Sequence, residues 1–262
     1  MTKPASSLYS VNHYGISDKI DCHIDRGCQL STPQPLVFFR ADDIGIPSSR
    51  FQELIECFKK HKLPLCLATV PSWLTEQRLK DLHQITGTNN AQWCWHQHGR
   101  VHRNFEKEGK KQEFGPARTQ NDIHTSLSKG RKRLEQLLDR DFQPVFTPPC
   151  NRCSSDTLQA LADLEFKAVS RSKGARPETL ADLPDFQVNV DLHTRKEIVP
   201  ELALDNLLKE LEQGFVSGLC GIMIHHQRMN RSAFELLDLL LGLIKNNRNL
   251  VPVHFADIPC NK

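Results

Sequence analysis

The stretch LVFFRADDIG, residues 36–45, decides the fold because an apolar run leads directly into two adjacent carboxylates and a glycine. A short, continuous apolar run of this kind is typical of a buried strand. In α/β proteins, charged side chains that follow a parallel strand enter the crevice where ligands bind. Because two like charges side by side repel each other, holding Asp42 and Asp43 there requires a compensating cation or proton. The pair therefore predicts a metal site whose other ligands come from elsewhere in the chain.

Strands and helices are predicted to alternate beyond residue 36. The predicted strands cover residues 36–41, 64–71, 92–95, 144–147, 166–170, 186–191, 221–224 and 250–255. The predicted helices cover residues 51–61, 76–86, 121–139, 156–164, 201–214 and 231–246. This alternation is the pattern of a parallel sheet with crossover helices, and about seven such units favour closure into a distorted (β/α)7-type barrel. Residues 1–34 lack a clear period and are predicted to form a partly irregular N-terminal extension to a single domain over 35–262.

Composition narrows the function classes. The 262-residue chain has 39% hydrophobic and 25% charged residues, which is ordinary for a soluble globular protein. A net charge of +3 does not indicate a nucleic-acid partner. No apolar run is long enough to predict a membrane span, and the N-terminus lacks the apolar core of a signal peptide. The nine scattered cysteines indicate reduced thiols, so a cytoplasmic protein is expected.

Further polar residues follow the other predicted strands. In a β/α barrel the loops after the strands share one rim, so these residues are expected to gather with the aspartate pair. They are His96, His98 and His102 after the third strand, Asn151 and Arg152 after the fourth, Asp191 after the sixth, and His225 and His226 after the seventh.

His98 and His102 are four residues apart. On a helical turn they would share one face and bind one ion. With one carboxylate they would form a two-histidine, one-carboxylate site that leaves positions open, as catalytic zinc sites do. Two solvated histidines on a surface helix explain the same spacing, since short motifs have high false-positive rates. The aspartate pair at an equivalent strand end favours the metal site, and Gly99 indicates an irregular turn.

These motifs resemble those of the polysaccharide deacetylase superfamily, of the NodB-homology or carbohydrate esterase family 4 type. ADDIG (41–45) matches the aspartate pair of the first family motif, and HGRVH (98–102) matches the second. TPPC (147–150) and IMIHH (222–226) correspond to the third and last motifs. The resemblance spans about residues 36–255 and places the chain in a divergent branch. ADDIG is also similar to the motif of the YdjC-like carbohydrate deacetylases, which share the barrel and a similar metal site.

The resemblance implies a NodB-like barrel that deacetylates an N-acetylated carbohydrate. It implies that Asp43, His98 and His102 hold a divalent metal, with zinc the expected ion. Asp42 would then be the general base that takes a proton from a water held by the metal.

The resemblance also implies roles for the later motifs. The backbone N–H of Cys150 would hold the oxyanion, and His225 would be the general acid that protonates the leaving amine. Asp191 is expected to orient and charge His225. Asn151, Arg152 and His226 are further candidates for contacts with the substrate.

The sequence departs from the family pattern at three positions. Thr147 replaces the arginine that holds the base, and either Arg152 or Arg40 is a substitute for it. Cys150 replaces a tyrosine. His226 replaces an aspartate, so the acid is either His225 or His226, of which His225 is in register with the motif.

Other features admit a structural as well as a functional interpretation. The C-x-x-C at residues 150–153 fits a redox pair or half a zinc knuckle, but packing and loop thiols are favoured for a lone motif. For His96, the alternatives are a third metal ligand or a group that supports the ligands, but an interior position with a satisfied N–H is favoured. His193 either lines the substrate site or is solvated. The remaining candidates for substrate contact are Trp73, which could stack on a sugar ring, and the basic residues Arg118 and Arg228.

The sequence thus predicts a metal-dependent hydrolase of non-peptide C–N bonds with a carbohydrate or small-molecule substrate. Two alternatives are left open. One is the same fold and metal acting on a small amide, imide or ureide, and the other is a non-catalytic metal-binding homologue. The sequence leaves the oligomeric state open.

Overall fold

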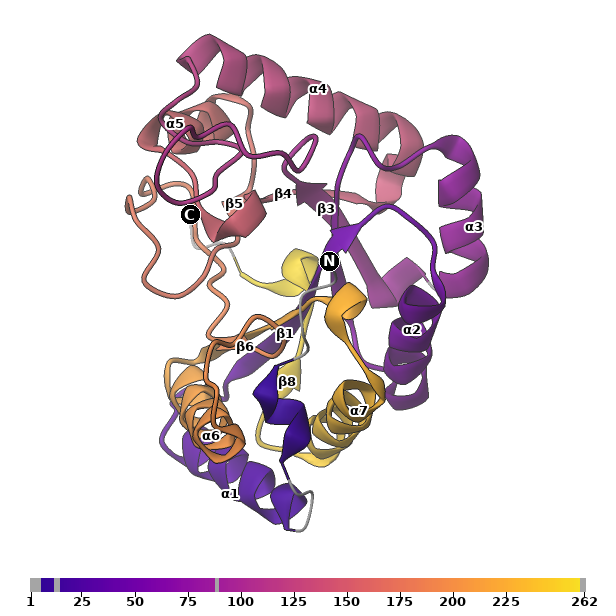
Figure 1. The fold of residues 1–262 in the computed structure, drawn as a ribbon, viewed down its shortest axis with the longest axis vertical. Coiled ribbons are helices and arrows are strands. Elements are labelled where there is room, and N and C mark those ends of the chain that lie inside the picture. Colours follow the sequence, from indigo (N-terminus) through magenta and orange to yellow (C-terminus); the bar gives the residue numbers. More distant parts are fainter. Residues whose placement is uncertain (1–5, 12–14, 88–89, 260–262) are drawn as a thin grey trace. The chain divides into compact units, whose positions relative to one another are not determined.

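The computed structural model describes residues 6–11, 15–87 and 90–259 and shows an α/β protein (Figure 1). The strands are β1 (Leu36–Ile44), β2 (Leu65–Thr69), β3 (Trp93–His98), β4 (Phe142–Thr147), β5 (Ala168–Val169), β6 (Val190–Asp191), β7 (Leu219–Ile224) and β8 (Val251–Pro252). The α-helices are α1 (Ile16–Gln29), α2 (Ser49–His61), α3 (Glu76–Thr86), α4 (Gln120–Leu138), α5 (Ser155–Asp163), α6 (Pro200–Val216) and α7 (Arg231–Asn246). Helices alternate with strands from β1 onward, as predicted.

The chain divides into two compact units. The first comprises Met1–Ala41, Ser48–Leu65 and Val188–His254, and the second comprises Asp42–Pro47, Cys66–Gln187 and Phe255–Lys262. Strand β1 begins in the first unit and ends in the second, so the two aspartates of the first motif belong to the second unit.

In the first unit, β1 pairs in parallel with β7 and with β8, and β7 pairs in parallel with β6. Phe39 lies opposite Ile222 in this ladder, and both are fully buried. Helix α2 packs against α7, where Lys60 forms an ion pair with Asp238. The apolar run at residues 36–39 is therefore part of an interior strand.

Helix α1 corrects the expectation that the N-terminal extension lacks a period. It packs along α6 in the first unit (Figure 1). Its buried residues Ile16, Ile20, Ile24 and Cys28 recur every four positions, which places them on one helical face. The apolar residues do recur with a helical period, but they form only a narrow stripe because the residues between them are mostly polar.

In the second unit, β4 lies between β3 and β5, and both pairings are parallel. The end of β1 is tied to β2 by a hydrogen bond from Val70 N to Ile44 O (2.8 Å). Helix α4 packs on α5 over an apolar core. That core contains Phe114, Ile123, Leu127, Phe146, Cys153, Leu158, Ala160, Leu161, Phe166, Val169 and Leu183.

Element bounds follow local capping where a cap exists. Helix α3 begins after Thr75, whose hydroxyl accepts a hydrogen bond from Arg78 N (3.2 Å), and it ends at the predicted Thr86 before Gly87. Strand β8 is shorter than predicted, and Pro252 has no N–H with which to extend the ladder. No described helix has the length and apolarity that crossing a lipid bilayer requires.

Candidate metal centre and active site

Asp43, His98 and His102 converge in the second unit, where one ligand atom from each lies within 4.8 Å of the others. Asp43 Oδ1 lies 2.9 Å from His102 Nε2 and 3.3 Å from His98 Nε2. His98 is buried, while Asp43 and His102 are half-buried, so the cluster is open on one side. One carboxylate oxygen and two imidazole nitrogens are a donor set typical of catalytic zinc.

A backbone carbonyl sets the tautomer of His98. Its Nδ1 lies 3.0 Å from Thr147 O, which can only accept a hydrogen bond, so Nδ1 carries the proton. The lone pair of Nε2 then faces Asp43 Oδ1, and two acceptors at this distance require a proton or a cation between them. A hydrogen bond from the other ring nitrogen to a backbone carbonyl is typical of metal-ligating histidines. The residues present therefore fit a divalent metal.

The directions of the pKa shifts in the cluster also support a cation site. Burial alone would raise the pKa of Asp43, but hydrogen bonds with His102 and His98 hold that pKa well below its ordinary value. Burial alone would lower the pKa of His102, but its hydrogen bond with Asp43 and the charges of Asp43, Glu113 and Asp42 raise it. The cluster thus keeps Asp43 ionised, and its carboxylates favour a positive charge beside them, either a proton on His102 or a metal ion.

A loop, and not the predicted helical turn, brings the two histidines together. His98 is the last residue of β3, and residues 99–102 contain no helix. Gly99 adopts φ +58, and a Cβ there would lie 2.4 Å from Glu113 Oε2 and 2.5 Å from Pro149 Cγ, so only glycine fits. Asp43 (φ 64) and His102 (φ 55) are also in the left-handed region. Such strained backbone is found mainly at functional sites.

Glu113 organises this loop and was not found from the sequence. Its buried carboxylate accepts hydrogen bonds from three successive backbone N–H groups, those of Arg100 (3.0 Å), Val101 (2.8 Å) and His102 (2.9 Å). Burial raises the pKa of Glu113, against the effect of these three donors. Sequence spacing carries no signal for such a residue, because its partners are main-chain groups.

Replacing Glu113 with alanine is expected to destabilise the protein by about 2 to 4 kcal/mol, because three loop N–H groups lose their acceptor. Zinc affinity should also fall by about 10- to 100-fold, as for other groups that orient metal ligands. Urea unfolding of the metal-free protein and zinc titration measure the two effects. The matched control is Glu108→Ala, which removes an exposed glutamate from the same loop. Equal stability of the two variants would refute the role of Glu113.

Thr147 and His96 form a buried layer beneath the centre. His96 Nε2 lies 3.0 Å from Thr147 Oγ1, and its ring packs edge-on against Phe255. His96 is fully buried, as expected for an interior histidine. Thr147, which stands at the family's arginine position, contacts His96 through its hydroxyl and His98 through its carbonyl. It therefore positions a candidate ligand and supplies no charge to Asp42.

Of the two arginines that could hold Asp42, Arg152 is not its partner, while the same role for Arg40 stays a prediction. Asp42 itself is almost fully buried. Within the described part of the chain, Arg152 has no carboxylate partner, so it does not hold Asp42. Arg40 is fully buried in the first unit and donates a hydrogen bond to Met223 Sδ (3.2 Å).

Neither a protein-family model nor a curated protein matches the sequence. Solved structures do match. A polysaccharide deacetylase from Bacillus cereus aligns with TM-score 0.54 and 14% identity, over 87% of this chain and 96% of that one. The carbohydrate esterase family 4 domain of a xylanase from the hindgut metagenome of Trinervitermes trinervoides aligns with TM-score 0.53 and 12% identity, over 86% and 89%. A carbohydrate esterase family 4 pseudoenzyme from Bacillus anthracis aligns with TM-score 0.52 and 13% identity, over 84% and 64%.

This chain has the polysaccharide deacetylase fold. The predicted fold class, a NodB-like distorted (β/α) barrel, is confirmed. The low identities agree with a divergent branch. Because one protein with this fold is a pseudoenzyme, the deacetylase fold does not by itself decide activity.

The third-motif loop of the deacetylase fold carries the C-x-x-C. Cys150 is exposed with φ 61, whereas Cys153 is buried and unpaired. Burial raises the pKa of the Cys153 thiol to about 11, with Asp185 adding to the rise and Arg171 opposing it. A buried thiol with a raised pKa is a poor nucleophile, so Cys153 has a packing role.

The last-motif histidines of the deacetylase fold lie in the first unit. His226 is buried and its ring meets Phe51 edge-on at 5.8 Å, whereas His225 is half-buried. His226 therefore packs against Phe51, and the choice of His225 as the acid stays a prediction.

Residues that follow β6 shape the surroundings of His225. Asp191 Oδ1 accepts hydrogen bonds from His193 N (3.0 Å) and Thr194 N (2.8 Å), which closes the turn after β6. His193 Nδ1 accepts a hydrogen bond from His225 N (3.0 Å). The side chain that forms a hydrogen bond with the His225 backbone is thus that of His193. The orienting role of Asp191 stays a prediction.

His193 is buried, which corrects the alternative of a solvated side chain. Its ring stacks on Tyr9 at 5.7 Å. Burial lowers the pKa of His193 well below its ordinary value, and the nearby His225, His226 and Arg228 add to this. His193 is therefore neutral at pH 7, with the proton on Nε2 and the lone pair of Nδ1 facing the backbone of His225.

Substitution of His193 is expected to separate this backbone contact from simple packing. His193→Leu removes the acceptor for His225 N and should lower the free energy of unfolding by about 1 to 3 kcal/mol. His193→Asn keeps an oxygen near the position of Nδ1 and should cost less. Urea denaturation compares the two variants, and a larger loss for asparagine than for leucine would contradict the assignment.

Two of the predicted substrate-contact residues, Trp73 and Arg118, lie in different surroundings. The ring of Trp73 lies 5.4 Å from that of His102, so it borders the metal centre. Arg118 instead lies 4.6 Å over the ring of Phe105 and donates to the Glu113 carbonyl (3.3 Å). These contacts give Arg118 a structural role in the loop before α4, and its contact with the substrate stays a prediction.

Proposed function

We propose that this chain is a metal-dependent hydrolase of non-peptide C–N bonds that deacetylates an N-acetylated carbohydrate. The observation that carries this proposal is the convergence of Asp43, His98 and His102 in a chain with the polysaccharide deacetylase fold. The donor set and the tautomer of His98 support a resident divalent metal, and we propose zinc.

A divalent metal bound there supplies a Lewis acid that activates water and polarises the acyl carbonyl. The chain's own residues supply the proton transfers. Asp42, whose carboxylate is buried beside the ligands, takes the proton from the attacking water. The backbone N–H of Cys150 donates to the developing oxyanion. His225, in register with the last motif, gives a proton to the leaving amine, and Asp191 is the proposed partner that keeps His225 charged.

A non-catalytic role is the second candidate, and the pseudoenzyme with this fold is the observation that favours it. Thr147 and Cys150 replace two residues of the family's third motif, which is where such a loss of activity would originate. In that case the protein would bind a metal and a saccharide without turnover.

Product analysis with the zinc-loaded protein tests the proposal. N-acetylated oligosaccharides, both neutral and anionic, should yield one free acetate for each free amine. Hydrolysis of small amides, imides or ureides without release of acetate would instead identify another substrate class. No turnover of any of these compounds would reject hydrolysis and support the non-catalytic role.

We also propose that the protein works in a reducing compartment such as the cytoplasm. Within the described residues every cysteine is a free thiol, and Cys28, Cys66, Cys94, Cys153 and Cys220 are buried. Reduced, buried thiols are typical of cytosolic proteins. The ninth cysteine, Cys260, lies outside the described residues.

A further inference from the structure

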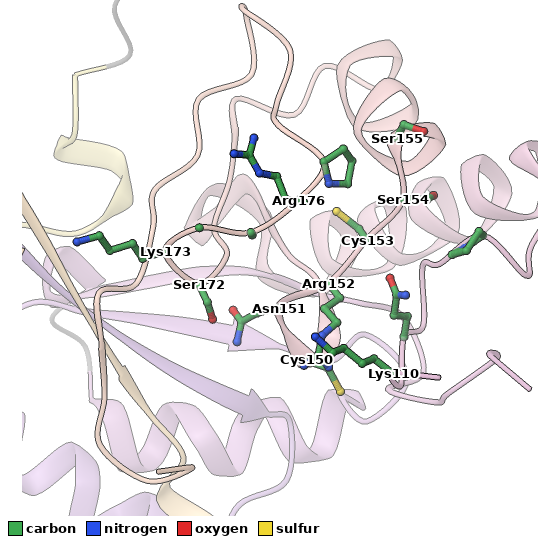
Figure 2. Close-up of a pocket in the computed structure, with 15 residues that line it drawn as sticks. Lys110, Cys150, Asn151, Arg152, Cys153, Ser154, Ser155, Ser172, Lys173 and Arg176 are labelled. Atoms are coloured by element: carbon green, nitrogen blue, oxygen red, sulfur yellow. The ribbon is translucent and has the colours of Figure 1, made fainter. Parts of the chain in front are cut away.

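A cavity of about 830 Å³ opens in the second unit (Figure 2). Three segments line it, namely residues 110–116, the β4–α5 loop at 150–155, and the loop at 172–177. Its volume is in the range of small-ligand sites. The structure therefore offers a binding space that the proposed catalytic residues do not fill.

The wall of this cavity is cationic. Four basic side chains line it, and none of the lining residues is an aspartate or a glutamate. Arg176 forms an ion pair with Glu178. In the part of the chain that the structure describes, Lys110, Arg152 and Lys173 form neither an ion pair nor a hydrogen bond through their side chains. Like charges gathered on one concave wall raise the local potential and favour an anion.

The unpaired cations of the cavity contrast with the buried cations elsewhere. Arg171 is fully buried and pairs with Asp185 at 2.8 Å. The guanidinium of Arg195 forms ion pairs with Glu197 and Glu210. The structure thus provides carboxylates for both of these arginines. Within the described residues, Lys110, Arg152 and Lys173 have no such carboxylate partner.

The cavity adjoins the metal centre because the same two loops build both. Thr147 O holds His98, and a Cβ on Gly99 would meet Pro149, the residue before the cavity-lining Cys150. On the other side, Glu113 holds the loop of His102 and follows Gln112, which lines the cavity. A saccharide with its N-acetyl group at the metal centre can therefore extend neighbouring rings into the cavity.

We propose that the cavity is a subsite for a negatively charged group, and that the substrate is an anionic N-acetylated saccharide. This inference rests on the proposed deacetylase function and specifies its substrate class. A carboxylate, sulfate or phosphate on a sugar next to the acetylated one binds Arg152, Lys110 and Lys173. Ser155 and Ser172 also line the cavity, and their hydroxyls are the hydrogen-bonding groups we propose for the sugar ring. A nucleic acid fits less well, because none of the lining side chains is aromatic and able to stack on a base.

Competition between matched substrates tests the subsite. The first substrate is a tetrasaccharide of alternating glucuronate and N-acetylglucosamine, and the second is the same compound with its carboxylates methyl-esterified. The zinc-loaded protein should show a kcat/KM at least about tenfold higher for the anionic form, with the ratio falling as salt is added. Sulfated and phosphorylated analogues identify which anion is preferred. Equal kcat/KM values for the acid and the ester would overturn the proposal.

Substitution of the basic residues tests whether the preference for the acid arises in this cavity. The double variant Arg152→Gln/Lys173→Gln should bring the acid-to-ester ratio of kcat/KM towards one. The matched control, Lys129→Gln, removes an exposed lysine from α4 and should keep the wild-type ratio. Circular dichroism confirms that each variant is folded. A full preference retained in the double variant would refute the assignment to this cavity.

A binding measurement separates the subsite from the proposed catalysis. Calorimetry of zinc-loaded Asp42→Asn with the two tetrasaccharides reports affinity without turnover. Tighter binding of the acid, lost in the Arg152→Gln/Lys173→Gln background, supports the subsite even if the wild type releases no acetate. Acetate release with equal binding of acid and ester would support the deacetylase and reject the subsite.

Discussion

Asp43→Ala is expected to lose tight zinc binding, with an affinity at least about 100-fold below that of the wild type. The variant removes the oxygen that lies within reach of both histidines and the charge that favours a cation there. Because changes in residues that merely orient metal ligands cost 10- to 100-fold, loss of a ligand should cost no less. Zinc content after dialysis and calorimetric titration measure the effect.

The matched control for Asp43→Ala is Asp182→Ala, which removes an exposed aspartate from the same unit. His98→Ala and His102→Ala should resemble Asp43→Ala. Unchanged zinc content in all three variants would mean that the cluster is a polar network and not a metal site.

Asp42→Asn is expected to keep its zinc and to lose turnover by about 10²- to 10⁴-fold, the usual contribution of a general base. Asparagine preserves the shape of the side chain but cannot take a proton from water. Acetate release and zinc content, measured on the same preparation, separate catalysis from binding. Turnover within a few-fold of the wild type would show that another group is the base.

The two aspartates thus differ in the expected consequence of their loss. Both lie near the end of the same strand, β1, yet Asp43 adopts a left-handed conformation that turns its carboxylate to His98 and His102. Asp42 is more deeply buried, with its charge acting on His102. Zinc loss in one variant and loss of turnover with zinc retained in the other would identify the two roles.

The candidate ligands were predictable from the sequence because they follow apolar strands at motif spacing. The helical geometry assigned to His98 and His102 was wrong, since the spacing of four also fits a strand end followed by a tight loop. Gly99 was the local signal for that loop, because a Cβ there has no room.

Glu113 and His193 were harder to predict because each acts on main-chain groups distant in sequence. Glu113 lies in a long polar loop whose lysines and arginines suggested a solvated or steering segment. Its carboxylate instead points inward to the loop of His102. From the sequence, His193 was either solvated or a substrate contact. Its stacking on Tyr9 and the hydrogen bond that it accepts from His225 N show that it is a buried, neutral hydrogen-bond acceptor.

The third motif decides whether the chain is an enzyme. Thr147 contacts the buried His96 and His98, so a neutral side chain stands at the position of the family's arginine. Arg40, the other arginine considered for holding Asp42, stays a prediction for that role, and Asp42 itself is almost fully buried.

Stoichiometric reconstitution tests the central claim most directly. The protein is stripped with a chelator, zinc is returned in steps, and acetate release from neutral and anionic N-acetylated oligosaccharides is measured at each step. The account predicts no acetate from the stripped protein and activity that rises linearly to a plateau at one zinc per chain. Full activity without zinc, or none at one bound zinc per chain, would contradict it.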